Sequence, residues 1–279
     1  SNHCRGGFRA QVVFMNALLI DAGNTRIKWA LLREGRIGAQ QAVPTATPEK
    51  LTAALARAPQ IDRVAVACVA GAGTESALRA ALRRAGTPDP EFLHSAAQAA
   101  GVTNGYRQPA RLGDDRWIGA VAAWHLGGCY RAVCAVSIGT ALTIDVVDCD
   151  GRHRGGLIAP GPTLMLQSLL RDTAQIAPRA KAGRSASRRK DAAAEPQLPM
   201  LANDTDRAIE LGCLSAAAAM VDRTVVDVTR VLRGRPVVFL TGGAADAVAP
   251  LLRSACKQHE DLVLRGLAIL AGIPVRRRG

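Results

Sequence analysis

The sequence predicts an α/β protein built from two similar halves, and three observations carry that prediction. Short apolar runs typical of strands alternate along the 279 residues with stretches of helical periodicity, which favours an α/β fold. Apolar residues make up 48% of the chain and charged residues 21%, enough apolar mass for one large domain or two smaller ones. Two hairpin-like segments with the same order of residue types place Asp21 and Ser137 at equivalent points, 116 positions apart.

The first expected hairpin covers residues 18–32. Its first strand is apolar and ends at Asp21. Gly23 and Asn24 follow, two residue types that tolerate the positive φ we expect in a tight turn. The second strand alternates, so that Lys28 points away from the face that carries the apolar side chains.

The polar residues of this first turn fit a phosphate site. Backbone N–H groups and the Thr25 hydroxyl offer hydrogen bonds to phosphate oxygens, and Lys28 follows closely enough to reach one. The Asp21 carboxylate could hold Mg²⁺ directly or through water, because bound Mg²⁺ usually keeps several waters. The alternative reading is a plain β-hairpin with a polar turn.

The second expected hairpin pairs residues 133–137 with residues 141–147. In its turn, Gly139 permits close approach of a ligand to the backbone and Thr140 can bind a phosphate. Asp145 is either an acid that supports the site or a polar residue on an exposed face.

A third candidate, Thr241-Gly242-Gly243, follows the apolar strand 237–240 and opens a helix. Helix N-termini favour anions, and glycine lets a ligand lie on the backbone. An ordinary strand–helix turn is the alternative.

The remaining elements follow from apolar periodicity and from Pro and Gly boundaries. Further strands are expected at 64–69 and 261–264. Helices are expected at 74–84, 116–124 with Asp114 and Asp115 in front, 162–171, 205–232 (unbroken or broken once), 243–252 and 266–270.

The net charge of +13 comes largely from arginine. Two basic stretches, 171–190 and 276–278, supply most of it, and a solvated loop and a frayed tail explain them. Such charge is compatible with nucleic acid, membrane surfaces or small anionic substrates. No helix-turn-helix, RNA-binding or zinc signature accompanies it, which argues against nucleic acid as a partner.

The cysteine pattern and the chain ends add further expectations. Seven cysteines without a C-x-x-C motif argue against a disulfide framework and a zinc ribbon, and indicate a reducing cytoplasm. The sequence has no apolar run of 18 residues, so no membrane span is expected. Residues 1–14, before Met15, are interpreted as a tag or upstream read-through.

Five motifs in register resemble those of type III pantothenate kinases, a family of the acetate/sugar kinase–Hsp70–actin superfamily. They are Asp-Ala-Gly-Asn-Thr-Arg-Ile-Lys at 21–28, Gly-Asp-Asp-Arg at 113–116, Gly-Thr-Ala-Leu-Thr-Ile-Asp at 139–145, Gly-Gly-Leu-Ile-Ala-Pro-Gly at 155–161 and Thr-Gly-Gly at 241–243. The resemblance spans about residues 17–273. It implies two duplicated ribonuclease H-like domains, at 15–120 and 121–279, with the ATP cleft between them.

The resemblance also implies ATP-dependent phosphorylation of pantothenate, the first step towards coenzyme A. The ATP-binding residues would be Asp21 (also facing Mg²⁺), Ala22, Gly23, Asn24, Thr25, Lys28, Gly139, Thr140, Gly242 and Gly243. Asp115 would be the general base, and pantothenate would be bound by Tyr106, Gly113, Asp114, Arg116 and Thr205. The family further implies a homodimer, in which Thr205 reaches the neighbouring subunit's site.

Three of these residues have a simpler explanation. Tyr106 lies in a Gly/Pro loop and could be a tyrosine packed on the surface. Asp115 precedes a helix and could be its N-cap, which stabilises a helix by about 1 kcal/mol, and Thr205 could cap the long helix in the same way. Asp115 and Arg116 are neighbours in a helix, where side chains diverge, so each could serve a separate ligand group.

Ser137 is a departure from the family pattern. Many members carry Asp there, which binds K⁺ or NH₄⁺ near the dimer interface. A neutral hydroxyl is a poorer cation ligand than a carboxylate, so we expect at most weak dependence on a monovalent cation. Two other functions stay open: another small-molecule kinase of the superfamily, and a non-catalytic regulatory factor that uses the basic stretches.

Overall fold

The computed structural model describes residues 15–172 and 201–276. The predicted leader at 1–14, most of the basic stretch 171–190 and the last three residues lie outside this range. Contacts divide the chain into two compact units, one formed by residues up to His94 together with those from Val263 onward, and one by Ser95–Leu262.

The first unit is built on the predicted hairpin. Its strands are β1 (Ala17–Ala22), β2 (Arg26–Arg33), β3 (Arg36–Ile37), β4 (Gln41–Pro44), β5 (Arg63–Cys68) and β6 (Glu91–Phe92). The sheet order is β3-β2-β1-β5-β6, with β4 also paired to β2. Strand β1 is antiparallel to β2 and parallel to β5.

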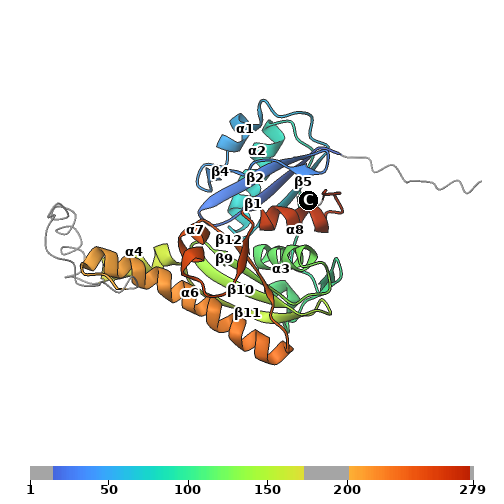
Figure 1. Ribbon diagram of the computed structural model, residues 1–279. Coiled ribbons are helices and arrows are strands. Elements are labelled where there is room, and N and C mark those ends of the chain that lie inside the picture. The colour runs from blue at the N-terminus through green and yellow to red at the C-terminus, as the bar shows by residue number, and fades with distance from the viewer. Residues whose placement is uncertain (1–14, 173–200, 277–279) are drawn as a thin grey trace, which may run out of the picture. The chain divides into compact units, whose positions relative to one another are not determined.

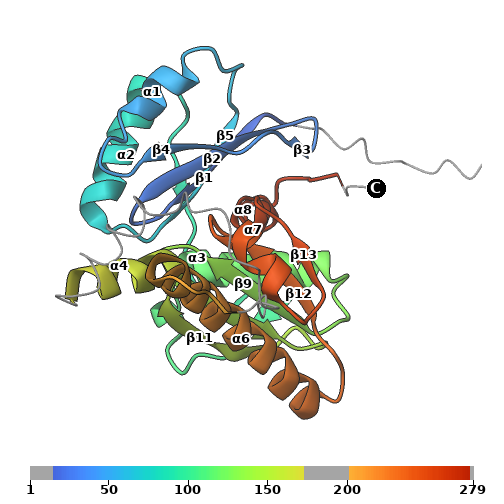
Figure 2. The same cartoon turned by 60° about the vertical axis from the view of Figure 1, so that its left-hand side comes forward.

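Helices of the first unit are α1 (Lys50–Leu55), α2 (Ala72–Arg84) and α8, which begins at Leu262 and ends at Leu270. Helices α1 and α2 lie together on one face of the sheet (Figure 2). Leu51 and Leu78 of these helices pack with Leu18, Ile20 and Trp29 in one buried cluster. The apolar face predicted for β2 is therefore confirmed.

The second unit repeats this arrangement. Its main strands are β9 (Val133–Ile138), β10 (Ala141–Val147), β11 (His153–Pro160), β12 (Val237–Thr241) and β13 (Cys256–Gln258), in the order β11-β10-β9-β12-β13. Strand β9 is antiparallel to β10 and parallel to β12. Each unit thus has an antiparallel hairpin, an outer antiparallel strand and two parallel strands, which confirms the expected duplicated ribonuclease H-like fold.

The other elements of the second unit are β7 (Gln98–Ala99), β8 (Val102–Thr103), the 3₁₀ turns η1 (Pro109–Arg111) and η2 (Ala249–Leu251), and the helices α3 (Asp114–Leu126), α4 (Pro162–Asp172), α6 (Thr205–Leu232) and α7 (Ala245–Val248). Helices α3 and α6 cover opposite faces of the sheet, and α4 lies beside the first half of α6 (Figures 1 and 2). Within the described residues, no helix is long and apolar enough to cross a membrane.

Three expectations about elements are corrected. Residues 261–264 are not a strand, because residues 262–270 form one helix and the last strand is β13. The helix expected to run to 252 is the short α7 followed by η2. Neither Gly23 nor Asn24 has a positive φ, so the first turn closes without the left-handed residue we expected.

The contact-based units differ from the predicted ranges 15–120 and 121–279. Helix α3 spans residue 120 and packs against β9 and β10, so it lies wholly in the second unit. Helix α8 belongs to the first unit from Val263 onward. The predicted domain ranges themselves stay a prediction.

Candidate active site

The turn of the first hairpin places Asp21 and Lys28 opposite each other. They are register partners on β1 and β2, so their side chains project from the same face of the sheet. The turn closes by a hydrogen bond from Gly23 N to Arg26 O at 3.1 Å, and Thr45 Oγ1 donates to Gly23 O at 2.7 Å. The structure therefore brings the acidic side chain of Asp21 and the basic side chain of Lys28 together beside the Gly23–Thr25 backbone.

The turn of the second hairpin is held by two glycine-containing segments. Gly139 N donates to Ala141 O at 3.0 Å, and Gly161 N donates to Thr140 O at 2.8 Å. Because helix α4 begins at Pro162, its N-terminus lies directly beside Thr140. Helix N-termini attract anions, so this helix strengthens the predicted phosphate site in a way that sequence spacing did not reveal.

Gly242 packs against the end of β9. It has φ of +102°, and a Cβ there would overlap backbone atoms of Ile138. The next turn is closed by a hydrogen bond from Ala244 N to Ile138 O at 3.0 Å. Gly242 is thus required by the fold, whatever its role toward ATP.

We expect Gly242→Ala to destabilise the protein by about 1–3 kcal/mol, because it adds both steric overlap and backbone strain. For a chain of this size, that lowers Tm by roughly 3–10 °C, measurable by circular dichroism. Gly243→Ala is the matched control, since a Cβ at Gly243 meets nothing within 4 Å. Equal Tm values for the two variants would contradict the packing argument.

Asp115 lies in the first turn of α3 but is not its N-cap. The N-cap is Gly113, whose carbonyl accepts from Trp117 N at 2.9 Å, and no side chain caps the helix. The Asp114 carboxylate instead accepts from Ser95 N at 2.7 Å. The capping alternative for Asp115 is therefore wrong, and its half-buried carboxylate needs another explanation.

The surroundings of Asp115 oppose its ionisation. Burial raises the pKa of Asp115 above the ordinary carboxyl value, and the nearby negative charges of Asp145 and Asp114 add to this effect. A hydrogen bond from Arg116 N to Oδ1 at 2.8 Å and the Arg116 charge act in the opposite direction. A carboxylate with a raised pKa is suited to accepting a proton.

Arg116 is anchored by Asp145, which lies on β10. Arg116 Nε donates to Asp145 Oδ2 at 2.9 Å, and Nη2 donates to Oδ1 at 2.7 Å. Burial works to lower the pKa of Arg116, but the hydrogen bonds and charge of Asp145 outweigh it and raise that pKa. Asp145 is buried, so the exposed-face reading is wrong and the supporting reading is favoured.

The half-buried Tyr106 and the buried His153 complete this group. Arg116 Nη1 donates to the Tyr106 hydroxyl at 2.9 Å. His153 Nε2 lies 3.0 Å from Asp145 Oδ1, and the rings of His153 and Tyr106 are 5.8 Å apart. The structure thus brings together the predicted residues Tyr106 and Arg116. The use of Arg116 as a direct substrate ligand stays a prediction.

Two glycines, Gly156 and Gly105, lie so close to the Arg116, Asp145 and His153 atoms that no larger residue would fit. A Cβ at Gly156 on β11 would overlap both Arg116 Nη2 and Asp145 Oδ1, and a Cβ at Gly105 would overlap the His153 carbonyl. Sequence reasoning missed His153. The available signal was its position two residues before the Gly155-Gly156 motif, on the strand next to Asp145.

Thr205 takes part in none of the hydrogen bonds that hold this group together. It is exposed at the start of α6, and the N-cap of that helix is Asp204, whose side chain accepts from Arg207 N at 2.8 Å. The capping explanation for Thr205 is therefore wrong. Its predicted contact with a neighbouring subunit's substrate stays a prediction.

Comparisons of the sequence with known proteins agree on one family. The family model described as type III pantothenate kinase matches residues 17–227. Type III pantothenate kinases of Nitrosococcus oceani and Burkholderia thailandensis are 37% and 39% identical to this chain, each over 91% of it and over 93% and 97% of their own lengths. Among solved structures, a putative 2-dehydro-3-deoxygalactonokinase from Sinorhizobium meliloti has a TM-score of 0.49 at 16% identity, covering 92% of this chain and 98% of that one. By its sequence relatives and the family match, this chain belongs to the type III pantothenate kinase family.

Proposed function

We propose that the protein transfers the γ-phosphate of ATP to pantothenate, which gives 4'-phosphopantothenate and ADP, the first step of coenzyme A biosynthesis. The observation that carries this proposal is the family match over residues 17–227. The half-buried Asp115, next to the anchored Arg116 and Tyr106, supplies a chemically suitable site for the acceptor alcohol.

The ATP phosphates are assigned to the two hairpin turns. Backbone N–H groups of Asn24, Thr25 and Thr140, with Lys28 and the N-terminus of α4, would bind phosphate oxygens, whereas the N–H groups of Gly23 and Gly139 close their own turns. Mg²⁺ is held in kinases by one or two carboxylates together with the phosphates. Asp21, at the end of β1, fits that role, and Mg²⁺ would neutralise charge on the transferred group. Within residues 15–172 and 201–276, no group of three or more metal-ligating side chains occurs.

Asp115 is assigned the role of general base, which accepts the proton of the pantothenate hydroxyl. Because Oδ1 already accepts from Arg116 N, we assign the proton to Oδ2. The hydroxyl oxygen forms a bond to the γ-phosphorus while the bond from that phosphorus to the bridging oxygen breaks and ADP leaves. Catalysis of such transfers rests mainly on positioning and charge stabilisation.

An ADP-release assay with Mg-ATP tests the proposal. We expect turnover that depends on pantothenate and not on a panel of sugars or acetate. Turnover with a sugar or acetate in its place would favour another kinase of the superfamily. No turnover with any acceptor, together with salt-dependent binding to random duplex DNA, would favour the regulatory alternative. The proposal includes a cytoplasmic location, supported by the cysteine pattern.

Monovalent cations are expected to have little effect. Ser137 has Thr143 and Thr241 as register partners on the neighbouring strands, so three neutral hydroxyl residues occupy this row of the sheet. Replacing K⁺ by a bulky organic cation should change the rate by less than about twofold, since hydroxyls are weak cation ligands. Ser137→Asp should introduce stimulation by K⁺. A many-fold loss of wild-type rate without K⁺ would contradict this prediction.

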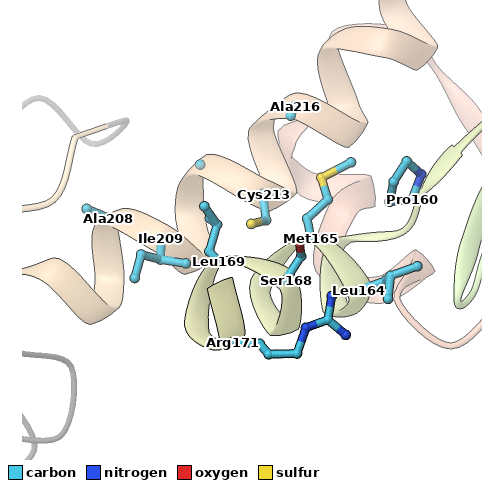
Figure 3. Close-up of a pocket in the computed structure, with 11 residues that line it drawn as sticks. Pro160, Leu164, Met165, Ser168, Leu169, Arg171, Ala208, Ile209, Cys213 and Ala216 are labelled. Carbon is cyan, nitrogen blue, oxygen red and sulfur yellow. The ribbon is translucent and has the colours of Figure 1, made fainter. Parts of the chain in front are cut away.

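We infer that a second copy of the chain covers the groove between α4 and α6. The groove holds a cavity of about 700 Å³. It is lined by Leu164, Met165 and Leu169 of α4 and by α6 residues that include Cys213 and Ala216 (Figure 3). Small residues on α6 permit close approach of another helix, and the exposed Thr205 lies at the start of the same helix.

We expect light scattering to show a dimer at micromolar concentration and Leu169→Glu to shift it toward monomer. Glutamate would replace an apolar side chain that the second copy covers, and burying its charge costs free energy. Val231→Glu is the control, since Val231 is 72% exposed near the other end of α6. A monomeric wild type would contradict the inference.

A further inference from the structure

We propose that His153 is a positioning residue: acting through Asp145, it holds Arg116 and Tyr106 in the arrangement that binds pantothenate. The inference rests on the proposed function, because it assigns Tyr106 to the substrate site. It adds a residue that carries no role in the reaction described above.

Asp145 is the centre of the arrangement. Its Oδ1 is shared by Arg116 Nη2 at 2.7 Å and His153 Nε2 at 3.0 Å, while Oδ2 accepts from Arg116 Nε. A carboxylate paired with a guanidinium can only accept hydrogen bonds, so His153 carries its proton on Nε2. The side chain of His153 is 0% exposed and that of Asp145 is 3% exposed, so water does not compete for these bonds.

This geometry determines what Arg116 can do. Two of its nitrogens are committed to Asp145, and Nη1 donates to the Tyr106 hydroxyl. The position of the guanidinium plane, and with it the position of Nη1, is therefore set by the Asp145 carboxylate. His153 holds the carboxylate from the other side, so a rotation of Asp145 would break three hydrogen bonds together.

The position of Tyr106 depends on His153 in two ways. Its hydroxyl oxygen accepts from Arg116, which leaves the hydroxyl hydrogen to donate to an acceptor oxygen of the substrate. Its ring lies 5.8 Å from the His153 ring at an interplanar angle of 39°. His153 thus contacts the tyrosine directly and also determines, through Asp145, where the tyrosine's hydrogen-bond partner lies.

The choice of histidine at this position favours a role beyond filling space. Its Nδ1 is buried and has no hydrogen-bond partner among the described residues. An unpaired buried polar atom costs stability, and an apolar side chain of similar size would avoid that cost. What histidine supplies and leucine cannot is the Nε2 hydrogen bond to Asp145.

A matched pair of variants tests the proposal. His153→Leu keeps the volume and removes the donor, whereas His153→Gln retains an N–H near the Nε2 position. We expect His153→Leu to raise the KM for pantothenate about ten- to a hundredfold, which corresponds to the loss of one hydrogen bond to a charged group. The KM for ATP and kcat should stay within about twofold, and His153→Gln should recover most of the change.

Tyr106→Phe combined with His153→Leu provides a second readout. If His153 acts through the tyrosine hydroxyl, the double variant has about the same KM as Tyr106→Phe alone. A merely structural role would lower Tm but leave the KM for pantothenate unchanged, and that result would overturn the proposal. A KM in the double variant that rises by the product of the two single-variant increases would also overturn the proposal. Should His153→Leu not fold, His153→Phe serves in its place.

The failure of this proposal is distinguishable from the failure of the proposed function. Wild-type protein without pantothenate-dependent turnover would refute the function and this inference with it. Normal wild-type turnover with an unchanged KM in both His153→Leu and His153→Phe would refute the inference alone.

Discussion

Asp115→Asn is expected to lower kcat for pantothenate phosphorylation by at least a hundredfold, since general-base assistance contributes about 10²–10⁴ in rate. The substitution keeps the shape of the side chain, and asparagine Oδ1 can still accept from Arg116 N, as Asp115 does at 2.8 Å. It removes the negative charge and replaces Oδ2 by an NH₂ group that cannot take a proton. The KM for ATP should stay within about twofold, and ADP release measures both quantities.

The control for this variant is Asp227→Asn. Asp227 forms surface ion pairs with Arg223 and Arg230 on α6, far from the proposed chemistry in sequence, and its loss should leave kcat unchanged. If Asp115→Asn and Asp227→Asn both retain the wild-type rate, Asp115 does not act as the base. Loss of turnover in both variants would point to a general effect on folding.

The dependence of wild-type kcat/KM on pH checks the same assignment independently. The base must be ionised to accept a proton, so the rate falls as the pH drops through the pKa of Asp115. Because burial raises that pKa, the fall should begin at a higher pH than the ordinary carboxyl value of about 3.8 would give. An acid limb at or below that value would contradict the raised pKa.

The same burial predicts a stability difference of definite sign. A carboxyl whose pKa is raised by folding binds its proton more tightly in the folded state, so its ionisation lowers stability as the pH rises from 3.8 through the folded pKa. Asp115→Asn removes this cost. Its Tm should exceed that of the wild type at neutral pH, and the difference should shrink as the pH falls.

The fold was largely predictable because its signals are local. The first strand of each hairpin is an apolar run, and these runs end at Asp21 and Ser137. The parallel strand at 237–240 is likewise a short, continuous apolar segment. The strand expected at 261–264 failed because a short apolar run does not distinguish a strand from a buried helix. Those residues continue into the apolar helix α8, which buries Leu264 and Leu267.

The site was only partly predictable because its decisive contacts are not local. The motif 113–116 identified Asp115 and Arg116, but the partner of Arg116 is Asp145, which comes from another element 29 residues away. Periodicity could not show that Asp145 is buried, since an acid in a strand is equally compatible with an exposed face. The proximity of His153 to Asp145 results from the pairing of β11 with β10, which the local sequence does not reveal.

Asp145→Leu is expected to have the largest effect on stability, a loss of about 3–5 kcal/mol, because it leaves the Arg116 charge buried without a partner. The two side chains are 7% and 3% exposed, so solvent cannot replace the lost carboxylate. The corresponding decrease in Tm is roughly 6–20 °C for a chain of this size. Calorimetry or circular dichroism measures it.

The exposed pair on α6 provides the contrast. Asp227, which is 46% exposed, pairs with Arg223 at 2.7 Å, a distance equal to that between Arg116 and Asp145. Asp227→Leu should nevertheless cost at most about 1 kcal/mol, because water solvates the remaining arginine. Similar losses for the two leucine variants would show that burial does not determine the strength of the Arg116–Asp145 pair.

Removing both charges separates stability from function. Arg116→Met combined with Asp145→Leu takes away the unpaired charge, so most of the lost stability should return, as replacement of buried ion pairs by apolar residues is often neutral. Pantothenate binding should not return, because Tyr106 has lost its partner at Nη1. A double variant as unstable as Asp145→Leu would mean that the carboxylate stabilises the fold through His153 rather than through Arg116.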